Sequence, residues 1–185
     1  MSHVNPKGHP HPLGFWEERY AEGPYAYGTE PNDFVREVAD RLPPGRVLCL
    51  GEGQGRNAVF LAQRGHDVTA MDQSPMGLQR AESLAAERGV KITTIAADLE
   101  EFMIEPLAFG AIVSIFVHLP HALRRDVHER VMNGLAEGGL YVFEQYAPGQ
   151  NEYKSGGPED PDRRPGLATV REDGQPHVTP LVAVW

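Results

Sequence analysis

The chain has 185 residues, which is enough for one domain with a substantial core. Its net charge of −9, without a run of Lys or Arg, argues against nucleic acid as the main partner and favours a small-molecule substrate. The single cysteine, Cys49, excludes a disulfide framework and a cysteine-based zinc site.

The two ends of the chain differ in composition from its middle. Residues 1–14 are rich in Pro and His and show no periodicity, so we expect a disordered leader. The start lacks a signal-peptide core, and no apolar run reaches the roughly 18 residues of a membrane span. We therefore expect a cytoplasmic protein without membrane contact. One domain is expected over residues 15–148, with a loop and a hairpin over residues 149–185.

Aromatic residues mark the start of the expected domain. A short helix should begin at Phe15, and a turn-rich segment should follow over residues 22–31. Trp16, Tyr20 and Tyr27 lie in this region. Either they cap the sheet, or they fold over the mouth of a ligand site, where an aromatic wall attracts a cationic ligand.

A helix and a strand come next. The apolar stripe from Asn32 to Leu42 predicts an amphipathic helix that ends at the Pro-Pro-Gly sequence after it. The four apolar residues 47–50 then predict a parallel strand that is covered on both faces. Cys49 lies within this strand, so we expect an inert buried thiol.

A glycine-rich turn follows this strand. Gly51, Gly53 and Gly55 let backbone amides approach a ligand closely. The next helix, from Arg56 to Arg64, points its N-terminus at the same place and favours negative charge there. Asp72 closes a second apolar strand, where its carboxylate can bind ribose hydroxyls in a doubly wound sheet. The pattern predicts a nucleoside-cofactor site.

The rest of the domain alternates helices and strands, which predicts a doubly wound α/β sheet that is mostly parallel. We expect Arg124, Arg125 and Arg130 to form the exposed face of one helix. The expected elements are a helix from Pro75 to Arg88 with Ser74 as N-cap, a strand at 91–96, a short helix at 99–103, a strand at 111–117, a helix at 121–135, a tight turn at Gly138 and Gly139, and a strand at 140–143.

Polar residues stand at the ends of the later strands. Asp98 follows the third strand and either caps the short helix after it or accepts a hydrogen bond from a ligand. His118 follows the fourth strand and is either a polar residue of the turn or a substrate contact and proton acceptor. Tyr146, at the end of the fifth strand, could reach the same pocket. His118 and His121 lack a third partner, so no metal site is expected.

The C-terminal segment departs from the pattern. Residues 149–166 are dense in Gly, Pro and charge and should form a loop, and residues 167–185 predict one β-hairpin. Residues 167–180 resemble the opening hairpin of flavin-binding split-barrel oxidases but are too short to be that domain. Either this hairpin completes the sheet, or the chain is a truncated or fused reading frame that leaves a sheet edge unpaired.

Four segments together carry a family resemblance: Tyr27 to Asn32, Gly51 to Asn57, Ala97 to Leu99, and Gly138 to Leu140. They resemble class I S-adenosylmethionine (SAM)-dependent methyltransferases, most closely the small tellurite-resistance (TehB-like) and thiopurine-like group. The resemblance covers roughly Phe15 to Pro158. It implies a Rossmann-like fold, SAM as cofactor, and methyl transfer to a small molecule with a sulfur, selenium, tellurium or other heteroatom acceptor.

The resemblance also implies roles for single residues. Asp98 would accept a hydrogen bond from the adenine amino group, and the end of the fourth strand would face the methyl group, which makes His118 the candidate catalytic residue. Glu52 is expected to neutralise the methionyl amino group. The full expected cofactor site comprises Tyr27, Gly51, Glu52, Gly53, Gly55, Asn57, Asp72, Gln73, Ala97, Asp98, Leu99 and Phe116, and Trp16, Tyr20 and Tyr146 are expected to line the acceptor pocket.

Two alternatives remain open. A SAM-binding protein without catalysis would fit the atypical C-terminus. An NAD-dependent oxidoreductase would use the same kind of sheet, but Arg56 stands where the dinucleotide pattern has its third glycine. The oligomeric state does not follow from the sequence.

Overall fold

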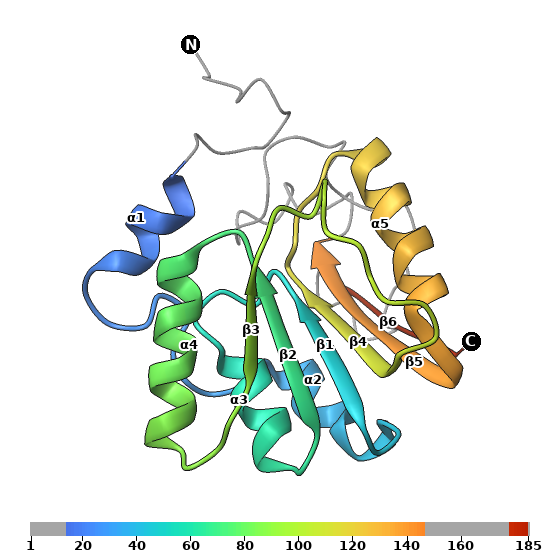
Figure 1. Ribbon diagram of the computed structural model, residues 1–185, viewed down its shortest axis with the longest axis horizontal. Coiled ribbons are helices and arrows are strands. Elements are labelled where there is room, and N and C mark those ends of the chain that lie inside the picture. Colours follow the sequence, from blue (N-terminus) through green and yellow to red (C-terminus); the bar gives the residue numbers. More distant parts are fainter. Residues whose placement is uncertain (1–13, 147–177, 185) are drawn as a thin grey trace.

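The computed structural model describes residues 14–146 and the backbone of residues 178–184 (Figure 1). Its six strands form one sheet in the order β3-β2-β1-β4-β5-β6. The strands are β1 Arg46–Leu50, β2 Asp67–Asp72, β3 Thr93–Ala96, β4 Phe109–Ile115, β5 Leu135–Tyr146 and β6 Val178–Val184. The first five are parallel, and β6 runs antiparallel to β5. The predicted doubly wound, mostly parallel α/β sheet is confirmed.

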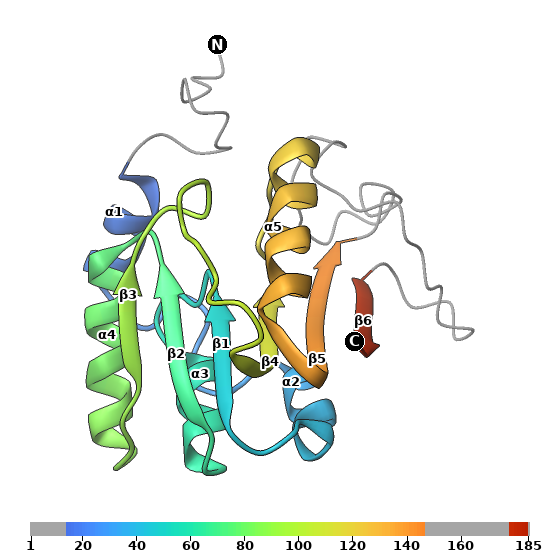
Figure 2. The same cartoon turned by 45° about the vertical axis from the view of Figure 1, so that its right-hand side comes forward.

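Helices cover both faces of the sheet. The helices are α1 Phe15–Ala21, α2 Asp33–Val38, the 3-10 turn η1 Ala39–Arg41, α3 Arg56–Gln63, α4 Pro75–Glu87 and α5 His121–Gly134. Side chains from α2, α3 and α4 form one core cluster with the sheet, and those of α5 form a second one. Helix α5 runs along β4 and β5 (Figure 2), whereas α1 lies beside α4. The strand order reverses between β1 and β4, which places a ligand crevice at their carboxyl ends.

Local sequence signals explain the helix starts. The side chain of Asn32 accepts a hydrogen bond from the Val35 amide at 3.1 Å and caps α2. Ser74 does the same for α4, where its hydroxyl accepts from the Gly77 amide at 3.0 Å and Pro75 occupies the first turn. The Ser74 cap was predicted from the sequence, and the capping role of Asn32 was not.

Three predicted elements are wrong in detail. Residues 99–103 form no helix, because the Asp98 carbonyl closes a single turn with the Glu101 and Phe102 amides at 3.0 and 2.8 Å. Strand β4 ends at Ile115 rather than at residue 117, since Phe116 has a φ of 56°. The predicted tight turn at Gly138 is an irregularity inside β5, which begins five residues earlier than the expected strand.

The expected exposed face of α5 is also wrong for two arginines. Arg124 is only 7% exposed, and its guanidinium donates to the Leu119 carbonyl at 3.2 Å. The Arg130 side chain is 12% exposed. Both side chains are drawn inward because backbone carbonyls of neighbouring loops lie within their reach. Arg125 is exposed, as predicted.

The C-terminal strand pairs with the sheet edge. Strand β6 lies along residues 140–146 of β5 in antiparallel register. This pairing fits the interpretation in which the C-terminal hairpin completes the sheet. The first half of that hairpin, the preceding loop and the N-terminal leader lie outside the described residues. Within the described part of the chain, every helix is too short or too polar to cross a membrane.

A close approach of two helices gives a stability prediction. Gly55 has a φ of 90°, and a β-carbon there would lie 2.5 Å from the β-carbon of Ala81 in α4. Gly65 has the same φ but open space around it. We expect Gly55→Ala to lower the free energy of unfolding by about 2–4 kcal/mol, from strain plus overpacking, and Gly65→Ala by about 1–2 kcal/mol from strain alone. Urea unfolding measures both, and equal losses would contradict the packing argument.

Candidate functional site

The carboxylate of Asp72 connects two turns at the carboxyl edge of the sheet. One of its oxygens accepts from the Gly53 amide at 2.7 Å, and the other accepts from the Ser74 amide at 2.8 Å. The Asp72 carbonyl also accepts from the Ala97 amide at 3.0 Å, which ties in the end of β3. The residue is 6% exposed, and burial raises the pKa of its carboxyl. Gln73, the next residue, is exposed.

Glu52 faces the start of α3. Its Oε1 accepts from the Asn57 and Ala58 amides at 2.9 and 2.8 Å, so the carboxylate caps the helix N-terminus. Burial raises the pKa of Glu52 to about 7, against the opposing effect of these two amides. The sequence did not predict this capping contact.

Helix α1 presses an aromatic residue onto the glycine turn. Tyr20 is buried, and a β-carbon on Gly53 would lie 2.7 Å from the Tyr20 hydroxyl oxygen. The same side of the Tyr20 ring also lies against Gly77 at the start of α4. Trp16 stacks on Tyr20 with ring centroids 5.6 Å apart. Burial, followed by the nearby Asp72, raises the pKa of Tyr20. Two of the predicted aromatic residues, Trp16 and Tyr20, therefore stand at the glycine turn.

Two residues that the sequence analysis missed hold α1 in place. The Glu17 carboxylate accepts from the Ser74 hydroxyl and from the Met76 amide at 3.2 Å. Arg80 in α4 donates to the carbonyls of Tyr20 and Gly23 at 3.1 and 2.8 Å. Each contact joins residues more than 50 positions apart, so no local sequence pattern could have revealed it.

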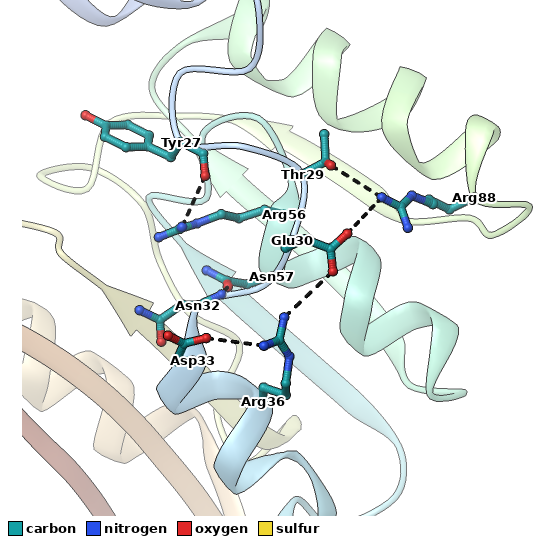
Figure 3. A network of polar contacts seen from close by, with 9 residues as sticks. All are labelled: Tyr27, Thr29, Glu30, Asn32, Asp33, Arg36, Arg56, Asn57 and Arg88. Atoms are coloured by element: carbon teal, nitrogen blue, oxygen red, sulfur yellow. Dashed lines mark hydrogen bonds and ion pairs between the residues drawn. The ribbon is translucent and has the colours of Figure 1, made fainter.

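The segment Tyr27 to Asn32, which we name the strap, crosses the ends of α2, α3 and α4 (Figure 3). Arg56 donates to the Tyr27 carbonyl at 3.3 Å. Arg88 donates to the Glu30 carboxylate at 3.1 Å and to the Thr29 hydroxyl at 3.3 Å. The first bond holds the backbone of the strap and the other two hold its side chains, while the Tyr27 side chain is 53% exposed.

The end of the strap is tied to the sheet. The Asn32 amide donates to the Asn57 side chain at 2.9 Å, and the Asn32 side chain donates to Glu144 at 2.6 Å. Gln54, in the glycine turn, accepts from the Ala26 amide at 2.6 Å just ahead of the strap. The structure thus gives the side chain of Asn57 a contact with the strap.

Aromatic side chains meet at the ends of β4 and β5. The rings of Phe116 and Tyr146 have centroids 4.9 Å apart, and His118 stacks on Tyr146 at 5.4 Å. The Phe116 amide donates to the Glu144 carbonyl at 2.8 Å, which holds its unusual backbone conformation. Burial, with Tyr27 and Glu144 nearby, raises the pKa of Tyr146. The structure therefore brings the predicted substrate residues His118 and Tyr146 together.

The turn after β3 presents the remaining predicted residues. The Asp98 side chain accepts from the Glu100 amide at 2.9 Å, Leu99 is buried in the core, and Ala97 is partly buried. Gly51, at the first position of the glycine turn, packs against Val117 after β4. The glycine turn, Asp72 and Asp98 thus lie along one edge of the sheet, beside the aromatic residues.

Comparisons with known proteins find methyltransferases. A family model described as a methyltransferase domain matches residues 47–139. The 2-heptyl-1-hydroxyquinolin-4(1H)-one methyltransferase of Mycobacteroides abscessus is 30% identical over 129 residues, covering 68% of this chain and 57% of that protein. The probable S-adenosyl-L-methionine-dependent methyltransferase TehB of Haemophilus influenzae is 32% identical over 89 residues, 47% of this chain and 31% of that protein.

A solved structure from work on the conversion of a disulfide bond into a thioacetal group during echinomycin biosynthesis has the same fold. Its TM-score is 0.67 at 21% identity, and the match covers 83% of this chain and 73% of that one. The chain spans about a third to just over half of the length of the two curated relatives.

Glu52 gives a prediction about pH. Because its folded pKa of about 7 lies above the ordinary 4.5, the folded protein binds more protons than the unfolded chain between these values. Its contribution to stability is therefore complete below pH 4.5 and is lost as the pH rises through 7. Glu52→Gln removes this titration. As the pH rises from below 4.5 to above 7, the unfolding free energy of the wild type should therefore fall relative to that of the variant, by on the order of 2–3 kcal/mol.

Urea unfolding across this pH range measures the difference. Glu87→Gln, at the exposed end of α4, is the control and should follow the wild type. Parallel curves for Glu52→Gln and the wild type would show that Glu52 does not titrate in this way.

Proposed function

The chain belongs to the family of methyltransferase domains, and from this premise we propose that it transfers a methyl group from SAM to a small-molecule nucleophile. The observation that carries the proposal is the placement of the glycine turn, Asp72 and Asp98 along one sheet edge, next to the aromatic residues after β4 and β5. The TehB relative is named as a SAM-dependent methyltransferase, which supports the same cofactor.

The described residues fit the three parts of this cofactor. The glycine turn and the N-terminus of α3 face its methionyl end. Asp72 binds the ribose, because each carboxylate oxygen that already accepts one amide retains a second lone pair for a hydroxyl. Asp98 accepts from the adenine amino group, and Ala97 and Leu99 lie beside the base. The proposed site is completed by Tyr27, Glu52, Asn57, Gln73 and Phe116.

The reaction needs alignment more than acid–base chemistry. SAM supplies a methyl group that is activated by the sulfonium. The protein orients the acceptor in line with that bond and excludes water. Trp16, Tyr20 and Tyr27 cover the site, and their ring faces favour a cation. His118, stacked on Tyr146, accepts the proton of an acceptor that loses one.

The acceptor belongs to the class of small molecules with a nucleophilic heteroatom. The name of the Mycobacteroides abscessus relative supports a flat hydroxylated heterocycle. The rings of Phe116, His118 and Tyr146 offer a surface on which a planar molecule could stack. Sulfur, selenium and tellurium compounds also belong to the proposed class of acceptors, as the family resemblance of the sequence implies.

Substitution of Asp72 tests the ribose contact. Asp72→Asn should weaken the binding of S-adenosylhomocysteine by about 1–3 kcal/mol, because an amide cannot replace a charged acceptor. Asp67→Asn, at the exposed opposite end of β2, is the matched control and should bind as the wild type does. Isothermal titration measures both affinities. Equal affinities in the two variants would exclude Asp72 from the cofactor site.

Substitution of His118 tests the proton acceptor. A panel of hydroxyl, thiol and selenol compounds first identifies a methylated acceptor. With that acceptor, His118→Gln should lower kcat by about a hundredfold or more and remove the acidic limb of its pH profile. His121→Gln, at the exposed first residue of α5 and three positions further along the chain, serves as the control. An unchanged pH profile in His118→Gln would show that His118 takes no proton.

A further inference from the structure

Helix α5 reaches across to the turn that holds Asp98. Arg130 donates through one nitrogen to the Phe102 carbonyl, and through the other to the Leu99 carbonyl at 2.8 Å. The second nitrogen also contacts Asp126 at 2.7 Å. The Arg130 side chain is 12% exposed, whereas that of Asp126 is 60% exposed. The two hydrogen bonds to carbonyls are therefore shielded from solvent, and the ion pair with Asp126 at the surface contributes little to stability.

The two carbonyls belong to the turn that Asp98 organises. The Asp98 carbonyl accepts from the Glu101 and Phe102 amides, and its side chain accepts from the Glu100 amide. The peptide carbonyl of Leu99 comes immediately after Asp98, and that of Phe102 ends the same turn. Arg130 therefore holds the turn that contains Asp98 from the side of α5.

Backbone hydrogen bonds also hold the two ends of the loop between β3 and β4, and the side chains of Leu99 and Ile104 within the loop are buried in the core. At its start, the Ala97 amide donates to the Asp72 carbonyl at 3.0 Å. At its end, the Leu107 and Ala108 amides donate to the carbonyls of Asn133 and Gly134, each at 2.9 Å. The turn at 98–102 lies between these anchors, where Arg130 contacts it.

We propose that Arg130 is a positioning residue, which holds Asp98 in place to read the adenine amino group and so sets the base selectivity of the cofactor site. The proposal rests on the proposed function, because it takes Asp98 as the adenine contact. Arginine suits the task because its planar fork binds two acceptors in a fixed geometry. Lysine offers only a compact point charge on a flexible stem.

The test compares two ligands and three variants of the full chain. S-adenosylhomocysteine carries the adenine amino group, and S-inosylhomocysteine has an oxygen in its place. In Arg130→Lys and Arg130→Met the Kd for the adenosyl ligand should rise about tenfold, while that for the inosyl ligand changes less than about twofold. Arg125→Met, an exposed position on the same helix, should keep both values. The ratio of the two Kd values is the readout, since a general loss of stability would weaken both ligands alike.

Amide hydrogen exchange supplies a readout that needs no ligand. In Arg130→Lys the Glu101 and Phe102 amides should exchange faster, whereas the Leu107 and Ala108 amides should keep the wild-type rate. Arg130→Lys retains the charge and the packed stem, so it decides the question if Arg130→Met does not fold.

The outcomes separate the two proposals. If the wild type binds neither ligand, the proposed function fails, and the exchange rates still show whether Arg130 fixes the turn. If the wild type prefers the adenosyl ligand and Arg130→Lys keeps both the ratio and the exchange rates, the role of Arg130 is overturned.

Discussion

A single buried carboxylate, that of Asp72, holds together the turns on which the site depends. It bonds to the Gly53 amide on one side and to the Ser74 amide on the other. The glycine turn after β1 and the start of α4 are thereby fixed relative to each other. A buried carboxylate without partners would be costly, so the amides that stabilise it also enforce the shape of both turns. The proposed ribose contact uses the same oxygens, which couples cofactor binding to the local fold.

Around this centre, arginines attach the covering segments through backbone carbonyls. Arg80 binds the C-terminal end of α1, Arg56 binds the strap, and Arg130 binds the turn after β3. A hydrogen bond from a charged donor stabilises by about 1.5–3 kcal/mol, which is more than a neutral one contributes. The covering segments can therefore be held firmly while a side chain such as that of Tyr27 stays exposed.

The sequence predicted what local patterns determine. The uninterrupted apolar run at residues 47–50, the glycine turn and the Ser74 cap each depend on a few neighbouring residues, and all appear in the structure. Some predictions failed, and for Arg130 the cause is contacts with distant residues. Residues 99–103 form a turn instead of a helix, and Arg130 is drawn inward because the carbonyls that it binds lie about 30 positions earlier in the chain.

The same limit applies to the site. The sequence placed Asp72 and Asp98 at strand ends, and the parallel sheet brings those ends to one edge. His118 stacks on Tyr146 two residues after Phe116, whose positive φ no residue pattern predicts, since positive φ is unusual for a bulky side chain. The pairing of β6 with β5 is likewise seen only in the folded structure.

The central claim is that the glycine turn and its carboxylates form a site for an adenosyl sulfonium cofactor. Isothermal titration of the full chain with SAM, S-adenosylhomocysteine and NAD tests it most directly. We expect both adenosyl ligands to bind and NAD not to bind, because Arg56 opens α3 where a dinucleotide site has its third glycine. Preferential binding of NAD, or no binding of either adenosyl ligand, would contradict the account.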